Sequence, residues 1–232
     1  MIAIIGAMPE EVKAVVDRME EVQSNQFSQI QFYQGILAKK EVVVMQSGVA
    51  KVAAALSTTV LFEHYDVDFV INIGTAGGLL ADQNVLDVVV STCVAHHDMD
   101  LSVFEWPKGF NQDKTCYQAD PNLVELVSRI IQEKDHVWVG PIASGDSFIY
   151  NEQQVAMIKK DYPEALCAEM EAAAIAQVCR HFNKPFVVIR SLSDITLKSD
   201  NHLTFNEYII LASERSALWC EKIVHEYGEV KS

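Results

Sequence analysis

Acidic side chains follow two apolar runs near the middle of the chain, at positions where they could give or take protons. The first run ends in Glu169-Met170-Glu171, and the second ends in Arg190-Ser191-Leu192-Ser193-Asp194. The residues between them predict a helix over 172–181, because apolar residues recur there with helical spacing. In open α/β sheets, ligands bind beyond the carboxyl ends of the strands. The two strand ends therefore predict a site for acid–base chemistry.

Each of these carboxylates also has an ordinary structural explanation. An acidic residue at a strand end often caps the helix that follows. Glu171 would lie in the first turn of its helix, where the helix dipole stabilises negative charge. Glu10 and Glu11 are placed in the same way behind Pro9, which suits the first position of a helix. For Glu10 we favour the dipole, whereas for Glu11 a chemical role stays open, since it would lie at the edge of the first strand.

The elements that position these residues follow from hydrophobic periodicity and turn signals. Strands are expected at residues 1–6, 29–37, 41–46, 67–73, 85–95, 137–143 and 186–189. Helices are expected at residues 9–20, 51–64, 122–133, 152–161, 172–181 and 205–227, the last one capped by Thr204. This alternation indicates an α/β fold with a mixed central β-sheet flanked by helices in three layers. Because the 232 residues contain no linker rich in Pro, Gly or Ser, we expect a single domain over 1–232.

The amino-acid composition argues against some classes of binding partner. The net charge of −14 results from 18 basic and 32 acidic side chains. Nucleic acids and anionic membranes attract clustered Lys and Arg, so we expect neither as a partner, and a small molecule suits better. The five cysteines are scattered and form no Cys-x-x-Cys pair. No apolar run approaches the ~18 residues that span a bilayer, and the first residues suggest a strand rather than a leader peptide. We therefore expect a cytoplasmic protein.

Two further segments contain residue types found in cofactor or metal sites, but in neither are the residues spaced as such a site requires. The glycine cluster Gly74–Gly78 lacks the lysine and the glycine pattern of nucleotide phosphate loops, so close backbone approach to an uncharged ligand is its expected use. In the segment His96–Asp100 the two adjacent histidines would point to opposite faces of a strand and could not easily share an ion. We expect no cofactor and no metal. The aromatic-rich segment 101–117 is expected to be irregular and to pack on a ligand or a partner subunit.

Seven short motifs, spread over most of the chain, resemble those of one enzyme family. In chain order they are G-A-M-P-E-E-V, S-G-V-A-K-V-A-A-A, N-I-G-T-A-G-G-L, H-H-D-M-D, S-G-D-S-F-I, A-E-M-E-A-A-A-I-A and V-I-R-S-L-S-D. Each is weak alone, but together they look like the 5′-methylthioadenosine/S-adenosylhomocysteine nucleosidases of the nucleoside phosphorylase superfamily. The resemblance implies that superfamily's fold, a homodimer, and hydrolysis of the adenine–ribose N-glycosidic bond in 5′-substituted adenosines.

The same resemblance assigns the chemistry to three carboxylates. Asp194 would protonate adenine N7, Glu11 would orient and deprotonate the attacking water, and Glu171 would bind the ribose 2′- and 3′-hydroxyls. The scheme is chemically coherent, because cleaving a glycosidic bond needs an acid on the leaving side and a base on the water side. Asp194 must be protonated to act, so we expect burial and nearby carboxylates to raise its pKa above the usual ~3.9.

The remaining contacts implied by the resemblance surround the nucleoside. Those expected near the water, the sugar and the base are Arg190, Thr75, Met170, Phe148 and the Ile149 backbone, with Gly77 and Ser193 as further substrate contacts. Those expected to line the 5′-substituent pocket are Met8, Val49 and Phe205, with Leu101 and Phe104 entering from the partner subunit. The short run D-L-S-V-F-E-W-P-K-G-F looks like that of family members that also act on 6-amino-6-deoxyfutalosine, which is a further candidate substrate.

Two other functions stay open. A purine nucleoside phosphorylase would bind phosphate, which guanidinium groups hold bidentately. The first 128 residues contain a single arginine, Arg18, and the negative charge of Glu11 would repel phosphate, so hydrolysis is favoured. A non-catalytic binding protein on the same fold would be expected to have lost one of the three carboxylates, and all three are present.

Overall fold

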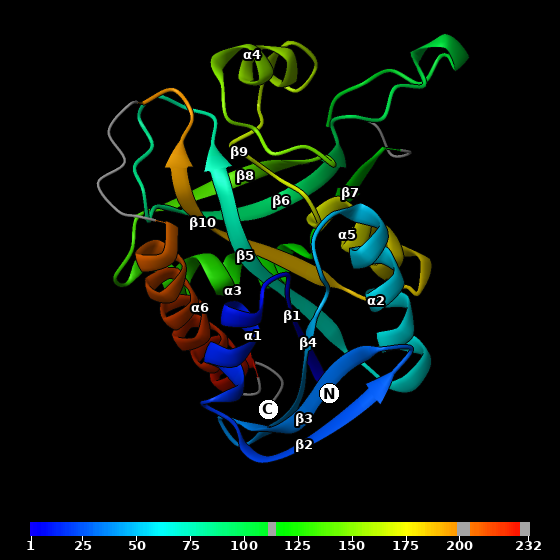
Figure 1. The fold of residues 1–232 in the computed structure, drawn as a ribbon, viewed down its shortest axis with the longest axis vertical. Helices are drawn as coiled ribbons and strands as arrows, with labels where there is room; N and C mark the ends of the chain where they lie inside the picture. The colour runs from blue at the N-terminus through cyan, green and yellow to red at the C-terminus, as the bar shows by residue number, and fades with distance from the viewer. Residues whose placement is uncertain (111–114, 199–204, 228–232) are drawn as a thin grey trace.

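One large sheet forms the centre of the computed structural model, which describes residues 1–110, 115–198 and 205–227 (Figure 1). The strands are β1 (Ile2–Gly6), β2 (Glu20–Phe27), β3 (Ile30–Leu37), β4 (Lys40–Gln46), β5 (Phe69–Gly78), β6 (Val88–His96), β7 (Cys116–Gln118), β8 (Val137–Ser144), β9 (Cys167–Glu169) and β10 (Phe186–Ile195). The helices are α1 (Pro9–Val16), α2 (Lys51–His64), the 3-10 turn η1 (Ser102–Phe104), α3 (Pro121–Gln132), α4 (Glu152–Asp161), α5 (Ala172–His181) and α6 (Phe205–Tyr227).

Half of the sheet closes on itself and the other half stays open. The strand order is β10-β6-β8-β9-β5-β1-β4-β3-β2, β7 pairs with β6, and β10 also pairs with β5. The strands β5, β10, β6, β8 and β9 therefore form a ring, from which β1, β4, β3 and β2 extend. Because β1, β5 and β10 are parallel neighbours, their carboxyl ends reach the same edge of the sheet.

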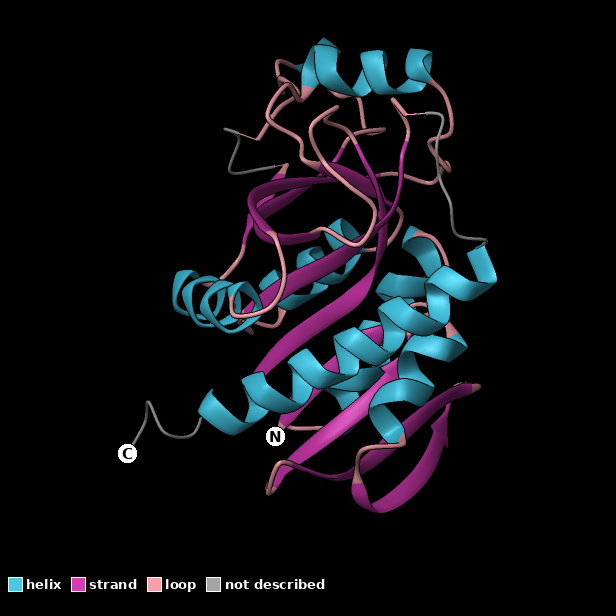
Figure 2. Cartoon of the chain, turned by 90° about the vertical axis from the view of Figure 1, so that its left-hand side faces the viewer, coloured by secondary structure: helices cyan, strands magenta, loops and turns pink. Residues whose placement is uncertain are grey.

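Helices cover both faces of the sheet and create one apolar core on each side. One core joins α2 and α5 to the strands through side chains such as Ala54, Leu61 and Ile175. The other joins α1, α3 and α6 through side chains such as Val15 and Ile223. Figure 2 shows α6 as the long helix that ends near the C label, lying against the strands. The predicted α/β class with a mixed sheet between helices is confirmed.

The first helix is shorter than the sequence predicted. Helix α1 begins at Pro9, as expected, but it ends at Val16 instead of residue 20. The chain then turns into β2, an edge strand whose side chains are almost all exposed. Its sequence, E-E-V-Q-S-N-Q-F, lacks the apolar alternation by which a half-buried strand is recognised, so periodicity gave no signal there.

The glycine cluster, expected to follow a strand that ends at residue 73, is instead part of that strand. β5 continues through Gly74 to Gly78, and β10 runs beside it to Ile195, beyond the predicted end at residue 189. Small residues are required here because a Cβ on Gly78 would lie 2.6 Å from Ile195 Cδ1. A Cβ on Gly74 would lie 3.1 Å from the Arg190 guanidinium carbon.

Smaller differences lie at other boundaries. The segment predicted as irregular over 101–117 contains η1 and the start of β7. β5 starts at Phe69 and β6 at Val88, two and three residues later than expected. The expected cap Thr204 lies outside the described residues. Among the helices that the structure describes, none is long and apolar enough to cross a membrane.

Candidate active site

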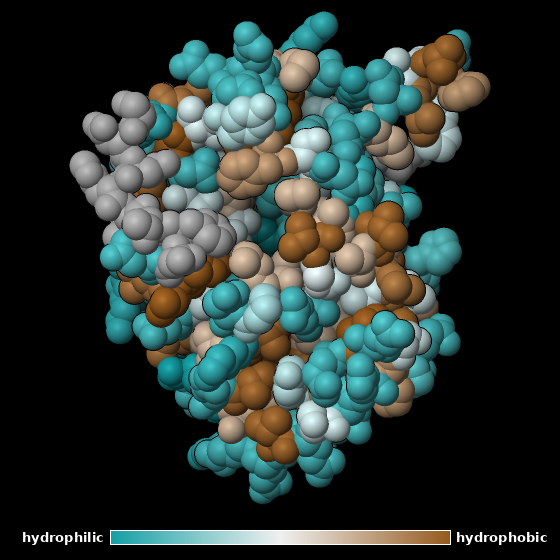
Figure 3. All heavy atoms as spheres, viewed as in Figure 1, coloured by the Kyte–Doolittle hydropathy of each residue, from teal (hydrophilic) through white to brown (hydrophobic). Residues whose placement is uncertain are grey.

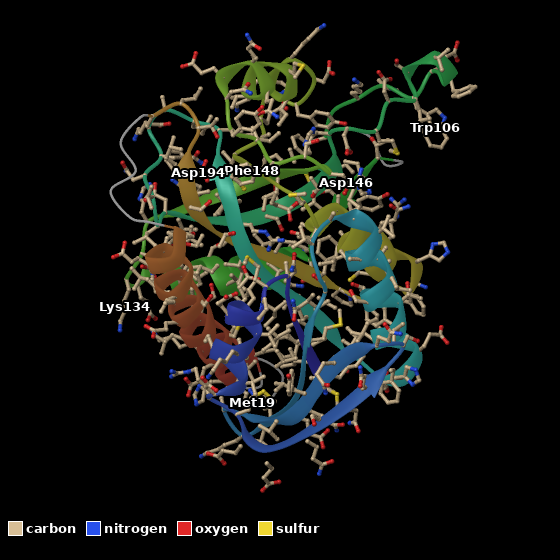
Figure 4. All side chains as sticks on the ribbon, viewed as in Figure 1. Met19, Trp106, Lys134, Asp146, Phe148 and Asp194 are labelled. Carbon is tan, nitrogen blue, oxygen red and sulfur yellow. The ribbon has the colours of Figure 1, made fainter. Side chains whose placement is uncertain are left out.

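The expected residues gather at the edge where β1, β5 and β10 end. The register of β5 and β10 places Asp194 opposite Gly77. Figure 4 shows Asp194 and Phe148 close together in the view, and a 3.5 Å hydrogen bond from Thr196 Oγ1 to the Ile149 carbonyl joins their two segments. Figure 3 shows a recess near the centre of this face, just below these labels.

Glu11 is buried at the start of α1, directly beyond β1. Its Oε2 accepts hydrogen bonds from the backbone N–H groups of Ala7 at 2.8 Å and Met8 at 3.0 Å. Its Cβ lies 3.0 Å from where a Cβ on Gly6 would be, so the strand end and the glutamate pack closely. Burial raises the pKa of Glu11, while the two backbone donors and the charge of Arg190 oppose that rise. The helix-capping explanation and a chemical role are thus compatible.

Arg190 is the cation of the site, and Glu169 is its partner. Both side chains are almost fully buried, and Arg190 NH2 lies 2.7 Å from Glu169 Oε2. The guanidinium also donates to Asn72 Oδ1 at 2.7 Å and to the Asn72 carbonyl at 3.3 Å. Burial would lower the pKa of Arg190, but the charges of Glu169, Glu171 and Glu11 raise it overall, so the guanidinium stays charged.

Glu169 also organises the start of α5. Its Oε2 accepts the backbone N–H groups of Glu171 at 3.0 Å and Ala172 at 2.8 Å. Its Oε1 accepts a hydrogen bond from Ser144 Oγ, which in turn accepts the Ala173 N–H at 2.9 Å. Carboxylates stabilise helix N-termini by satisfying amides that have no partner within the helix. One glutamate thus ties β8, β9, β10 and α5 together.

Glu171 follows β9 and is buried next to this ion pair. Its Oε1 accepts the backbone N–H of Ala50 at 2.8 Å, across 121 positions in sequence. Burial, together with the charge of Glu169, raises the pKa of Glu171 to about 7. Glu171 therefore holds a proton over much of the acidic range, and it is close to half-protonated near neutrality.

Asp194 lies half-buried on β10. Burial raises its pKa, while hydrogen bonds from Ser193 and Thr196 oppose the rise. Ser193 Oγ lies 2.6 Å from Asp194 Oδ1. The hydroxyl of Tyr208 on α6 donates to the Ser191 carbonyl of β10 at 2.8 Å. Burial raises the pKa of Tyr208, and the charges of Glu11 and Asp194 add to that rise. A carboxyl that keeps its proton more tightly than usual is suited to act as an acid.

Comparison with known proteins identifies the family. The model of the phosphorylase superfamily matches residues 1–225. A 5′-methylthioadenosine/S-adenosylhomocysteine nucleosidase of Bacillus pumilus (strain SAFR-032) is 42% identical over 218 residues, which cover 93% of this chain and 94% of that protein. The chain belongs to this nucleosidase family.

Solved structures of other nucleosidases agree closely with the fold. A 5′-methylthioadenosine/S-adenosylhomocysteine nucleosidase from Neisseria meningitidis, in complex with methylthio-immucillin-A, is 37% identical with a TM-score of 0.89, covering 97% of this chain and 98% of that one. A nucleosidase from Colwellia psychrerythraea in complex with adenine is 38% identical with a TM-score of 0.88, covering 96% and 93%. The nucleosidase resemblance drawn from seven motifs is therefore confirmed.

The other residues expected to surround the substrate differ in their exposure to solvent. Phe148 and Val49 are exposed, whereas Ile149 is buried. Residues that are half-buried at the strand ends are Met8, Thr75, Gly77, Met170 and Ser193. The side chain of Phe205 lies outside what the structure describes. Leu101 and Phe104 belong to residues 99–110, a segment that we call the arm. The arm projects away from the rest of the molecule and carries η1 at its tip (Figure 1).

Sequence reasoning missed Glu169 as a member of the site. The residue precedes Glu171 by two positions, so the alternation of a strand would have placed both side chains on one face. Its link to Arg190 was not visible, because it depends on β9 and β10 both lying beside β5. In the segment predicted not to bind metal, His96 Nε2 lies 3.1 Å from Gln177 Oε1 and Asp98 pairs with Lys51.

Proposed function

We propose that this chain hydrolyses the adenine–ribose N-glycosidic bond of 5′-methylthioadenosine, S-adenosylhomocysteine and related 5′-substituted adenosines, releasing adenine. The observation that carries the proposal is the pair of carboxylates Glu11 and Asp194. Glu11 follows the carboxyl end of β1 at the start of α1, and Asp194 lies near the carboxyl end of β10. Both have raised pKa values, and the charges of both raise the pKa of the same Tyr208. An acid and a base at one edge of the sheet are what glycosidic hydrolysis requires.

In the proposed mechanism, Asp194 gives its proton to adenine N7. The electron pair of the bond between C1′ and N9 then moves onto the base, which leaves as neutral adenine, and positive charge develops on the ribose. Glu11 takes a proton from a water molecule, whose oxygen bonds to C1′. The products are adenine and the free 5′-substituted ribose. Each proton transfer of this kind contributes roughly 10²–10⁴-fold to the rate.

The nucleoside would be oriented by the residues around these two carboxylates. Glu171 binds the ribose 2′- and 3′-hydroxyls in this proposal, and its contact with the Ala50 amide leaves its other oxygen available for them. The exposed ring of Phe148 offers a flat face for adenine to stack on, and the Ile149 backbone would bond the edge of the base. Met8, Val49 and Phe205 would line the pocket for the 5′-substituent.

Water is favoured over phosphate as the nucleophile because the arginines are engaged elsewhere. The chain has five arginines. Arg18, Arg129 and Arg215 form ion pairs with acidic residues away from the site, and Arg180 lies over the Tyr117 ring. Arg190 is held by Glu169 and Asn72. A phosphate beside Glu11 would therefore meet a carboxylate without a guanidinium that is free to fork around it.

We further propose a homodimer in which the arm completes the 5′ pocket of the partner subunit. Val103 is 83% exposed and Phe104 is 70% exposed at the tip of a projecting segment, where apolar side chains need cover. Phe104→Asp is expected to favour the monomer and to raise the KM for 5′-substituted nucleosides. Sedimentation velocity across a concentration series tests this assembly, with Ile210→Asp at an exposed position on α6 as the control variant.

We also infer that the chain acts as a single domain in the cytoplasm, where five free cysteines would persist.

The decisive experiment is adenine release from 5′-methylthioadenosine in phosphate-free buffer, repeated with phosphate added. Release without phosphate, together with free 5-methylthioribose, is the expected result. Release that requires phosphate would make the chain a purine nucleoside phosphorylase and overturn the role of Glu11. Absence of release in both buffers would count against the proposal altogether. The same assay with 6-amino-6-deoxyfutalosine tests that compound as a further substrate.

A further inference from the structure

Three segments that are distant in sequence meet at one charged cluster beside the site. Lys51 Nζ lies 2.6 Å from Asp98 Oδ1 and 3.6 Å from Asp146 Oδ2. Asp98 Oδ2 accepts the backbone N–H of Asp146 at 2.9 Å. We call these three residues the junction. It links the start of α2, the base of the arm and the segment that leads to Phe148.

The junction also holds the backbone at the start of α2. The N–H of Lys51 donates to Asp146 Oδ1 at 2.9 Å, and the preceding N–H, that of Ala50, donates to Glu171 Oε1 at 2.8 Å. Two successive amides at one helix start therefore bind two carboxylates from different parts of the chain. One carboxylate belongs to the proposed ribose site and the other to the junction.

Ala50 adopts a backbone conformation that an alanine rarely takes. Its φ is 75° and its ψ is 165°, in a region that is essentially reserved for glycine. Strain of this kind persists only where surrounding contacts fix it. Here those contacts are the bonds to Glu171 on one side and to Asp146 on the other. Loosening the junction would release Ala50 and move the amide away from Glu171.

The base side of the proposed substrate is tied to the same point. Asp146 precedes Phe148 by two residues, and in the view of Figure 4 the Phe148 label lies between those of Asp194 and Asp146. Asp98 immediately precedes the arm. A shift of any one of the three segments is therefore transmitted through Lys51 to the other two.

We propose that Lys51, Asp98 and Asp146 are positioning residues that hold the ribose-binding and adenine-binding parts of the site in register, and thereby set the affinity for the nucleoside. The inference rests on the proposed function. It assigns to the junction no contact with the substrate and no part in proton transfer. Its effect reaches the substrate through the Ala50 amide, Glu171 and Phe148.

The global stability of the fold does not explain why these three charged residues of the junction are placed together. Ion pairs between partly exposed side chains typically contribute little to folding. Lys51, Asp98 and Asp146 are 22%, 31% and 45% exposed at their side chains. A loss of the junction should therefore change substrate binding more than unfolding, and this difference separates a positioning role from a merely structural one.

The first test compares Lys51→Met with Lys51→Arg and a matched control. Lys51→Met keeps the aliphatic stem and removes the charge. We expect its KM for 5′-methylthioadenosine to rise about tenfold, the equivalent of one charge-assisted hydrogen bond, while kcat stays close to wild type. Lys51→Arg should recover most of the affinity. Lys184→Met, which removes a similar ion pair with Asp66 elsewhere on the surface, should change neither constant.

The second test does not depend on catalysis. Hydrogen exchange of the Ala50 and Lys51 amides should be faster in Lys51→Met and in Asp98→Ala than in wild type or Lys184→Met, while exchange in the sheet stays unchanged. If wild type releases no adenine, the proposed function fails, but these exchange rates still decide whether the junction fixes the backbone. Unchanged amide exchange, an unchanged KM, or a loss confined to kcat would overturn the proposal.

Discussion

Arg190 is paired with Glu169 in the interior of the protein, with 2.7 Å between NH2 and Oε2. The glutamates proposed to work on the substrate, Glu11 and Glu171, lie near this cation without being its closest partner. Backbone N–H groups of Ala7, Met8 and Ala50 bond their ionised forms instead, while burial raises the pKa of both carboxyls and favours their protonated forms. Carboxylates that are only weakly neutralised are available to exchange protons and to bind hydroxyls.

Replacing Asp194 by Asn should abolish most turnover, because an amide cannot supply the proton to the leaving base. We expect the turnover number for adenine release to fall roughly 10²–10⁴-fold. Binding of the nucleoside, measured by calorimetry, should be largely retained. Turnover close to that of wild type in Asp194→Asn would contradict the acid assignment.

Removing the hydroxyl of Ser193 should shift the pH dependence. Ser193 Oγ lies 2.6 Å from Asp194 Oδ1 and stabilises its ionised form, so its loss raises the pKa of Asp194 further. Because the protonated form is active, the basic limb of kcat/KM should move to higher pH, by roughly 0.5–1 pH unit. Ser57→Ala in α2, where the hydroxyl bonds the Ala54 carbonyl, is the control. A basic limb that moves to lower pH would disprove the reasoning.

Replacing Glu169 by Gln should destabilise the fold strongly. The change leaves Arg190 buried without a carboxylate, and breaking one side of a buried ion pair costs about 3–5 kcal/mol. Glu221→Gln removes the partner of Arg18 at the surface and should cost at most ~1 kcal/mol. Urea unfolding of both variants provides the comparison. Equal losses of unfolding free energy in the two variants would show that the buried ion pair stabilises the fold no more than the surface pair does.

The stability of the protein should fall as the pH rises through the weakly acidic range. The pKa of Glu171 is raised from 4.5 to about 7 on folding, so between these values the folded protein keeps a proton that the unfolded chain has lost. The contribution of Glu171 is therefore fully present below its unfolded pKa and is lost as the pH approaches the folded pKa. Unfolding free energies of wild type and Glu171→Gln, measured from pH 4.5 to 7.5, should diverge in slope. Identical slopes would argue against a raised pKa.

Ala50→Gly should stabilise the protein, because glycine adopts the observed φ of 75° without steric cost. We expect a gain of about 1 kcal/mol in the free energy of unfolding. Ala55→Gly, in the middle of α2, should instead lose roughly 0.5–1 kcal/mol. Thermal or urea unfolding of the two variants checks the opposite signs. A loss in both variants would mean that Ala50 is not strained.

Local patterns predicted much of this structure because they carry their signal within a few residues. The apolar period of α5, the Pro9 start of α1 and the apolar run of β1 all appear where the sequence placed them. β2 was missed because an exposed edge strand needs no apolar alternation. The glycines of β5 look like a loop in sequence, and only their pairing with β10 makes them a strand.

The site was predicted less completely, for a related reason. Glu11, Glu171 and Asp194 are predicted as site residues because family motifs mark them, and their roles stay a prediction. The bond between Glu171 and Ala50 and the pairing of Arg190 with Glu169 depend on contacts between separate elements. Such contacts follow from the closure of β5, β10, β6, β8 and β9 into a ring, which no single stretch of sequence specifies.

The burial of every cysteine has a practical consequence for spectroscopy. Cys93, Cys116, Cys167, Cys179 and Cys220 are free thiols inside the fold. Maleimide reagents would therefore leave the native protein nearly unlabelled, and a single cysteine introduced at the exposed Ser102 would carry the dye alone. Fluorescence from that position would report the surroundings of the arm tip in solution, with the native thiols left in place.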